Sequence, residues 1–286
     1  MNNLSSIKKL VSENRLDYSH YALARFIDDT IINSTELCLW LSVLVNIELS
    51  HGNVCLEISS VNRKCRELGW TECPEGDDLL QKINSSEVVG RENQQKPLIL
   101  ENKKLYLNRY YHNEKNISDR LLTMSKVNES EISLILLDSL FGKSKQLDYQ
   151  KLAAVISSRH QLSIISGGPG TGKTWTVSKI LALLIQQQKG NQKLDIKLAA
   201  PTGKAAARLS ESILKLRGAM QLDNAILNQI PVEAVTLHRL LGIHRFTHRP
   251  RHHKNNVLAC DVLVLDEASM IDQQMMAAIC CALPPH

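Results

Sequence analysis

Apolar and polar positions follow two different patterns along this chain, and they predict two regions of different design. In the first region, one dense apolar stretch, Leu37 to Leu49, stands among polar sequence. In the second region, short apolar runs alternate with segments whose apolar residues recur every three or four positions. Short apolar runs are typical of buried strands, and apolar residues that recur every three or four positions are typical of helices. The polar stretch from His112 to Ser130 predicts a boundary near residue 120.

The first region, residues 1–120, is expected to be a small, mainly helical domain. The stretch Leu37–Leu49 is apolar on nearly every side, which predicts a buried helix. The segment from Pro97 to Leu107 predicts a β-hairpin with Asn102 and Lys103 at its tip. Helices with a small hairpin suggest a winged-helix-like shape.

The second region, residues 121–286, is expected to be an α/β domain with a parallel sheet and helices on both faces. Apolar runs at Leu162–Ser166, Ile196–Ala200 and Val262–Leu265 predict buried strands. Helical spacing follows the first two of them, and Ile132–Leu140 predicts a further helix before them. Strands that alternate with helices are typical of this fold class.

Composition is that of a globular protein with a mild basic excess. Apolar residues make up 43% and charged residues 22% of the 286 positions, and the formal net charge is +5. This excess permits an anionic partner without demanding one. The odd count of seven cysteines, with no C-x-x-C pair, argues against a disulfide framework or a zinc site. No apolar run has the length of a membrane span, and the polar N-terminus is unlike a signal peptide, so a cytoplasmic location is expected.

A glycine-rich turn between the predicted strand 162–166 and the next helix fits the pattern G-x-x-x-x-G-K-[ST]. This P-loop motif consists of Gly167, Gly168, Pro169, Gly170, Thr171, Gly172, Lys173 and Thr174. Glycines let backbone N–H groups approach a phosphate, and the helix N-terminus adds its positive dipole end. Lys173 supplies a cation for the β- and γ-phosphates of a nucleotide, and the Thr174 hydroxyl is a Mg²⁺ ligand. The motif predicts an ATP site with Mg²⁺.

Two acids follow the strand Val262–Leu265. Asp266 is predicted to hold the Mg²⁺ shell, and Glu267 is predicted to orient or deprotonate the attacking water. Gln150 precedes the P-loop, and its amide can both donate to and accept from the N6/N7 edge of adenine, so it is a candidate for selecting ATP.

Two further segments present polar side chains after or near predicted strands. Thr202 and Lys204 follow the strand Ile196–Ala200, where they can either hold phosphates of a nucleic-acid backbone or belong to an ordinary capped helix. Thr236 can cap a short helix or donate to a phosphate.

The basic run 244–254, with Phe246 inside it, is interpreted as a solvated loop or as a track for DNA. The aromatic residues gathered in the first region are either core or a platform for a partner or for unpaired bases.

The four segments GGPGTGKT, APTGKAAARL, TLHRLLG and LVLDEASMID together resemble the first motor domain of superfamily-1 helicases that move 5′ to 3′. Within that superfamily the chain resembles the RecD family, the alpha subunits of bacterial RecBCD (exodeoxyribonuclease V), and the stretches GNVCLEIS and KPLILENKKLYLNRYY extend the resemblance into the first region. The resemblance implies a RecA-like P-loop NTPase motor domain and a DNA helicase subunit acting in double-strand-break repair by recombination. It implies that Thr202, Lys204, Thr236 and His238 contact single-stranded DNA, and that RecB and RecC are partners, with the first region docking chiefly onto RecC.

The sequence departs from the family in two places. Trp175 follows the P-loop threonine where the family usually has a small residue. The family continues with a strand, a Gly-Asp-x-x-Gln motif and a second motor domain, which supplies an arginine to the γ-phosphate, and this sequence stops before them. The sequence is therefore expected to be a fragment or truncated product with little ATPase activity and no unwinding of its own.

Two other functions remain open at this point. The chain could be a nucleotide-binding scaffold whose P-loop only stabilises an assembly. It could also belong to another P-loop class, such as transporter ATPases, although it has no transporter-type signature before Asp266.

Overall fold

A computed structural model describes residues 4–127, 132–143, 146–168, 170–188 and 193–285 of the chain. They form two compact units, residues 1–114 and residues 115–286. Among the described residues, no helix combines the length and the apolar character needed to cross a bilayer.

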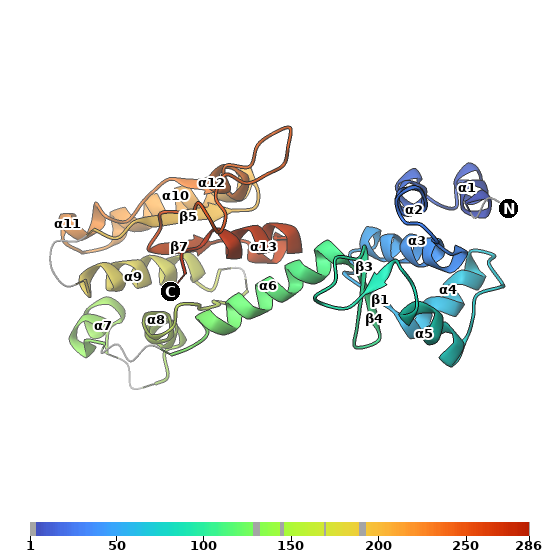
Figure 1. The fold of residues 1–286 in the computed structure, drawn as a ribbon. Coiled ribbons are helices and arrows are strands. Elements are labelled where there is room, and N and C mark those ends of the chain that lie inside the picture. The colour runs from blue at the N-terminus through green and yellow to red at the C-terminus, as the bar shows by residue number, and fades with distance from the viewer. Residues whose placement is uncertain (1–3, 128–131, 144–145, 169, 189–192, 286) are drawn as a thin grey trace. The chain divides into compact units, whose positions relative to one another are not determined.

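Unit 1 is mainly helical and contains one small sheet (Figure 1). Its sheet has the order β1-β4-β3-β2, in which β2 and β3 are parallel and the other pairs are antiparallel. The elements of this unit are α1 (Ser5–Ser12), α2 (Tyr18–Thr30), α3 (Glu36–Ser50), β1 (Leu56–Glu57), a 3-10 turn (Ile58–Ser60), α4 (Val61–Glu67), α5 (Gly76–Asn84), β2 (Val89–Gly90), β3 (Leu98–Glu101) and β4 (Lys104–Leu107).

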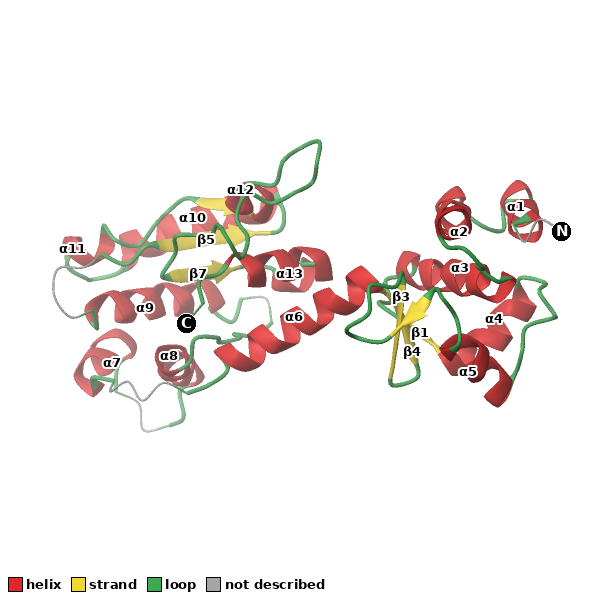
Figure 2. Cartoon of the chain, viewed as in Figure 1, coloured by secondary structure: helices red, strands yellow, loops and turns green. Residues whose placement is uncertain are grey.

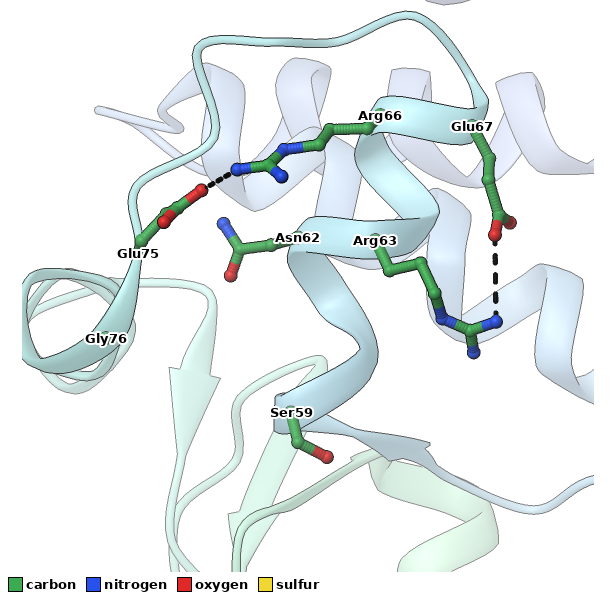
Figure 3. Close-up of a pocket in the computed structure, with 7 residues that line it drawn as sticks. All are labelled: Ser59, Asn62, Arg63, Arg66, Glu67, Glu75 and Gly76. Atoms are coloured by element: carbon green, nitrogen blue, oxygen red, sulfur yellow. Dashed lines mark hydrogen bonds and ion pairs between the residues drawn. The ribbon is translucent and has the colours of Figure 1, made fainter.

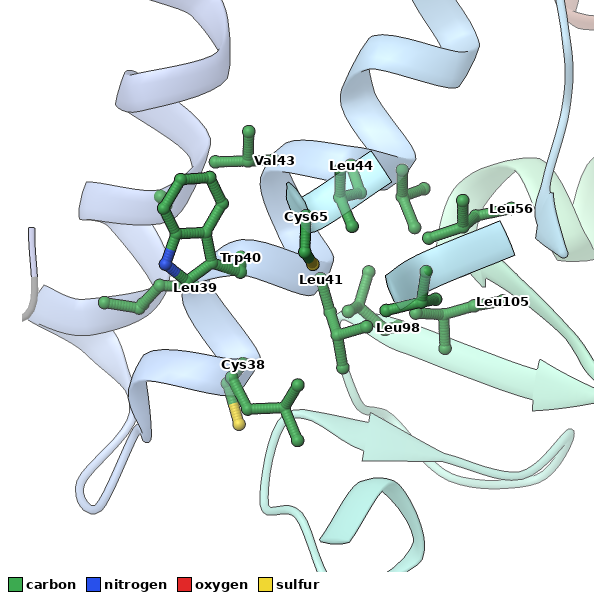
Figure 4. Packing of buried hydrophobic residues seen from close by; sticks show 14 of the residues in the cluster. Cys38, Leu39, Trp40, Leu41, Val43, Leu44, Leu56, Cys65, Leu98 and Leu105 are labelled. Carbon is green, nitrogen blue, oxygen red and sulfur yellow. The ribbon is translucent and has the colours of Figure 1, made fainter. Parts of the chain in front are cut away.

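The helix α3 forms the centre of unit 1, as its apolar sequence predicts. Leu39, Leu41 and Val43 are fully buried in one hydrophobic cluster. Trp40 lies in the same cluster and is 1% exposed (Figure 4). Its ring stacks on Trp70 with ring centroids 5.3 Å apart. Burial of nearly every side of one helix explains why it carries no polar face.

The predicted hairpin is confirmed as β3 and β4. The register pairs Glu101 with Lys104, which leaves Asn102 and Lys103 as the two turn residues. Both have positive φ angles, 48° and 62°. This is the left-handed conformation that two-residue hairpin turns require, and asparagine adopts it readily.

The aromatic residues of unit 1 divide between core and surface. Trp40, Trp70, Tyr106 and Tyr111 are buried. Tyr18 and Phe26, by contrast, project from α2 with exposed fractions of 67% and 62%. Core packing therefore explains only the first group.

Unit 2 contains a parallel sheet with the strand order β6-β5-β7 (Figure 2). The helix α6 (Asn108–Met124) contains the point that divides the two units. The remaining elements are α7 (Leu134–Phe141), α8 (Tyr149–Arg159), α9 (Lys173–Gln186), β5 (Ile196–Ala200), α10 (Gly203–Ala219), α11 (Asn224–Leu227), β6 (Ala234–Thr236), α12 (Leu237–Leu241), β7 (Val262–Leu265), a 3-10 turn (Ala268–Met270) and α13 (Gln273–Ala282).

Helices cover both faces of this sheet, which confirms the predicted α/β architecture. On β5, Leu198 packs with α7, α8, α9 and α10, whereas its neighbour Ala199 packs with α12 and α13. On β7, Val264 and Leu265 alternate in the same way. Successive residues of a strand point to opposite faces, so a strand covered on both sides is largely apolar.

The prediction of a buried strand at residues 162–166 is wrong for the structure as described. This segment has no strand pairing, and Ile164 is 84% exposed. Only Ile165 packs against the core, where it contacts the cluster around α9. An apolar run becomes a strand only where a neighbouring strand pairs with its backbone, and the described sheet offers none here.

A buried histidine near the start of α2 is expected to make the stability of unit 1 depend on pH. His20 is 5% exposed, and its Nδ1 accepts a hydrogen bond from the Asp17 backbone N–H at 3.1 Å. Burial lowers the pKa of the His20 ring, partly opposed by the charge of Asp17. Because the unfolded chain takes up this proton near pH 6.5, we expect stability to be complete above that pH and to fall as the pH drops below it.

The measurement is urea unfolding of the wild type and of His20→Gln at pH 7 and pH 5. A glutamine at this position can still accept from the Asp17 N–H but does not titrate. We expect the wild type to lose more stability between the two pH values than the variant. Equal losses would show that another group causes the pH dependence.

Candidate functional site

The P-loop turn adopts backbone angles that depend on glycine. Gly170 and Gly172 have φ angles of 77° and 81°, which L residues with side chains rarely adopt. A Cβ atom on Gly167 would lie 2.7 Å from Thr171 Oγ1, so a side chain there would require Thr171 to move. Pro169 lies outside the described residues.

The lysine of the motif lies over this turn. Lys173 begins α9, and its Nζ donates to the carbonyls of Gly167 at 2.6 Å and Gly168 at 2.9 Å. Thr171 Oγ1 donates to the Gly168 carbonyl as well, at 2.9 Å. The ammonium is thus held at the mouth of a turn that leads directly into a helix N-terminus, which is the arrangement that binds phosphate.

Gln150 contacts the same turn from another helix. It lies in the first turn of α8, where Asp148 caps the helix and accepts from the Gln150 backbone N–H at 2.8 Å. Its side-chain Nε2 donates to the Thr171 carbonyl at 3.4 Å. The structure therefore places Gln150 beside the P-loop, although 20 residues lie between Gln150 and Thr171 in the sequence.

Three polar segments lie at one edge of the sheet. The register pairs Ala200 with Thr236, and the Asp266 backbone N–H donates to the Ala199 carbonyl at 2.9 Å. Thr202 follows β5, Thr236 ends β6 and Asp266 follows β7. Because the three strands are parallel, all three residues lie at their carboxyl ends, where open α/β sheets bind ligands.

The packing direction of α9 brings the P-loop toward this edge. Leu183 of α9 and Leu198 of β5 belong to one hydrophobic cluster. Figure 2 shows that α9 runs antiparallel to β5, so its first turn, with Lys173 and Thr174, lies toward the carboxyl ends of the strands.

Asp266 and Glu267 directly follow β7. Asp266 is half-buried and Glu267 is exposed. Neither carboxylate has a hydrogen-bond or ion-pair partner within the part of the chain that the structure describes. Glu267 has a φ of 50°, a conformation that is uncommon outside glycine and marks a sharp turn at the strand end.

The donor set at this edge fits Mg²⁺ bound with a nucleotide. The ion prefers oxygen ligands and is usually held by one or two protein groups plus phosphates and waters. The Thr174 hydroxyl and the Asp266 carboxylate are such groups. A cage made of protein ligands alone is not expected for this ion, and the described residues contain no cluster of three or more metal-binding side chains.

Two of the four predicted DNA contacts are helix caps, and the other two are exposed. The Thr202 hydroxyl accepts from the Ala205 N–H at 3.2 Å and caps α10, and the Thr236 hydroxyl accepts from the Arg239 N–H at 3.3 Å and caps α12. Lys204 and His238 are exposed in the first turns of these helices. Capping and phosphate binding are compatible, because a capping hydroxyl keeps its own proton to donate.

The loop between α12 and β7 carries the basic run 244–254. Its residues are largely exposed, and Phe246 is 83% exposed. Figure 1 shows the loop projecting from unit 2 beside α12. Local hydrogen bonds from the His244 N–H to the Arg249 carbonyl and from the His248 N–H to the His244 carbonyl close it into a compact bend.

Unit 1 contains a hollow whose lining includes none of the motif residues. It has a volume of about 510 Å³ and is lined by α4 and the start of α5. Figure 3 shows that its arginines are paired, Arg63 with Glu67 and Arg66 with Glu75. With its charges neutralised internally, this hollow offers no excess charge for an ionic ligand.

Comparison with known proteins agrees with this organisation. Residues 12–106 match the family model "RecBCD enzyme subunit RecD, N-terminal domain", and residues 150–286 match an AAA domain. The RecD subunit of the RecBCD enzyme of Haemophilus influenzae is 48% identical over 148 residues, covering 50% of this chain and 23% of that protein. The corresponding subunit of Mycolicibacterium smegmatis is 37% identical over 261 residues, covering 88% of this chain and 44% of that protein.

A further relative is the ATP-dependent RecD2 DNA helicase of Deinococcus radiodurans, 35% identical over 129 residues, or 44% of this chain and 14% of that protein. The chain thus spans less than half of the length of each of these relatives.

Proposed function

Because the chain belongs to the RecD family, we propose that it forms the nucleotide-binding part of an ATP-dependent DNA helicase subunit that moves 5′ to 3′ on single-stranded DNA. The proposal includes assembly with RecB and RecC and a role in double-strand-break repair by recombination. The observation that supports it is the contact of Lys173 and Gln150 with the P-loop turn, in a unit that also places Asp266 at the carboxyl edge of its sheet.

Each residue of the site has a proposed part in hydrolysis. Lys173 and the backbone N–H groups at the start of α9 bind the phosphates of ATP. Thr174 and Asp266 hold Mg²⁺, which neutralises charge on the phosphate oxygens when bound. Glu267 orients the water that attacks the γ-phosphate and accepts its proton. The Gln150 amide binds the adenine edge.

The DNA contacts are proposed to lie along the same edge of the sheet. Thr202 and Thr236 donate their hydroxyl protons to phosphates of the strand, and Lys204 and His238 lie beside them. Contacts to the backbone bind without reading sequence, which suits a protein that moves along DNA.

The test is ATP turnover of the complete subunit, measured with and without single-stranded DNA. A motor should hydrolyse ATP faster when DNA is present. Binding of ATP without DNA-dependent turnover would instead favour a nucleotide-binding scaffold.

Replacement of the capping threonines with aspartate separates capping from DNA binding. Aspartate is as good a helix cap as threonine, but its charge repels a phosphate. We expect Thr202→Asp and Thr236→Asp to keep the stability of unit 2 and to weaken binding of single-stranded DNA at least about fivefold. Thr→Ser at either position is the control, because serine keeps both the cap and the donor. DNA binding that is equally strong in the aspartate variants would exclude these two contacts.

A further inference from the structure

The residue after the P-loop threonine lies next to the candidate base-binding side chain. A Cβ atom built on Gly172 would lie 3.0 Å from Gln150 Nε2 and 4.0 Å from Trp175 Cβ. Gln150 therefore approaches Gly172 from α8, and Trp175 lies in the first turn of α9, which Gly172 caps. A nucleotide whose phosphates occupy the loop has to place its base close to this pair if Gln150 contacts the base.

The indole ring of Trp175 makes a cation–π contact with a lysine. Lys179 lies one helical turn further along α9, and its Nζ is 5.0 Å from the Trp175 ring centroid and 4.8 Å from that of Phe141. Side chains at positions i and i+4 of a helix are neighbours, and an ammonium above an indole face is attracted to it. Lys179 is itself partly buried, and this burial lowers its pKa. These contacts hold the ring in a defined orientation near the start of α9.

We propose that Trp175 stacks on the base of the bound nucleotide, and that Trp175 and Gln150 together form the base-binding part of the site. This inference rests on the proposed function. An indole offers a large flat surface, and stacking between an aromatic ring and a base depends little on which base is present. The Gln150 amide then supplies selectivity, because its donor and acceptor match the N6/N7 edge of adenine.

The alternative is that Trp175 only packs against Lys179 and Phe141. The two roles differ in what the indole does for a ligand that has no base. A stacking residue strengthens binding of ATP and leaves binding of inorganic tripolyphosphate unchanged. A packing residue affects both ligands equally, through the shape of the phosphate loop, or affects neither.

The experiment is equilibrium binding of ATP, GTP and tripolyphosphate to the 286-residue chain, in the wild type and in Trp175→Thr, Trp175→Phe and Gln150→Ala. We expect Trp175→Thr to weaken ATP and GTP by the same factor, between about 5-fold and 100-fold, and to leave tripolyphosphate unchanged. Phenylalanine retains an aromatic face, so Trp175→Phe should restore most of the lost affinity. Gln150→Ala should weaken ATP more than GTP.

Three results would overturn the inference. One is Trp175→Thr binding ATP as tightly as the wild type does, and another is an equal loss for ATP and tripolyphosphate in both Trp175→Thr and Trp175→Phe. The third is a wild-type chain that binds none of the three ligands, which would also overturn the proposed function. Tight tripolyphosphate binding by the wild type, with no effect of Trp175→Thr on ATP, would leave the phosphate site intact and remove only the stacking role.

Discussion

Replacing Lys173 with glutamine is expected to weaken ATP binding to this chain about 10- to 100-fold and to lower ATP turnover of the complete subunit about 10²- to 10³-fold. The ammonium lies at the mouth of the glycine turn, where two carbonyls hold it. Glutamine has similar reach but no charge, so that it cannot stabilise the charge that develops on the γ-phosphate. Isothermal titration gives the affinity, and phosphate release gives the turnover.

Lys204→Gln is the matched control for this change. Lys204 is also a lysine near the start of a helix at the carboxyl edge of the sheet, and it is exposed. We expect this variant to bind ATP like the wild type and to lose affinity only for DNA. If Lys173→Gln bound ATP within twofold of the wild type, Lys173 would not be a phosphate ligand.

Replacing Trp40 with alanine is expected to destabilise unit 1 by about 3–5 kcal/mol. Trp40 is 1% exposed and stacks on Trp70, so truncation removes a large buried surface and leaves a cavity in the middle of α3. Native-state hydrogen exchange measures the effect as the opening free energy of the α3 amides.

Trp40→Phe provides the comparison, because it retains a ring that can stack on Trp70 and should cost clearly less. Leu181→Ala supplies a control in unit 2, where the side chain is 1% exposed in α9 and belongs to a separate hydrophobic cluster. An α3 opening free energy within 1 kcal/mol of the wild type in Trp40→Ala would show that this ring does not support the core.

Elements with a strong local signal could be predicted from sequence. The buried helix α3 followed from its dense apolar stretch, and the β3–β4 hairpin followed from Asn102-Lys103 between two apolar segments. Strands β5 and β7 followed from apolar runs covered on both faces of the sheet. In each case the order of apolar and turn residues in the segment itself is enough to indicate its secondary structure and its burial.

Elements whose pattern is mixed were harder to predict. Helix α2 was missed because its apolar residues do not share one face: Ala24 and Ile27 are buried, whereas Tyr18 and Phe26 face solvent. The segment 162–166 was predicted as a strand because it is apolar, but strand formation depends on a partner strand that local sequence cannot reveal.

The candidate site was predicted by motif more readily than by position. The P-loop and the acids after β7 follow from spacing, and the placement of the acids at the sheet edge follows from parallel strands. The proximity of Gln150 and Trp175 at Gly172 could not be predicted, because it depends on how α8 packs beside α9. The sequence marked Trp175 only as an unusual residue after the P-loop threonine.

The central claim is that the P-loop and the acids after β7 bind one nucleotide together through Mg²⁺. Its most direct test is the affinity of the chain for ATP, measured with and without Mg²⁺ in the wild type and in Asp266→Asn. We predict that Mg²⁺ strengthens ATP binding in the wild type. In Asp266→Asn, the affinity for Mg²⁺ in the ATP complex should fall at least about 10-fold. This variant should therefore lose most of the gain from Mg²⁺, while its affinity for ATP without Mg²⁺ stays unchanged. The same Mg²⁺ dependence in both proteins would contradict the claim, because Asp266 would then lie outside the nucleotide site.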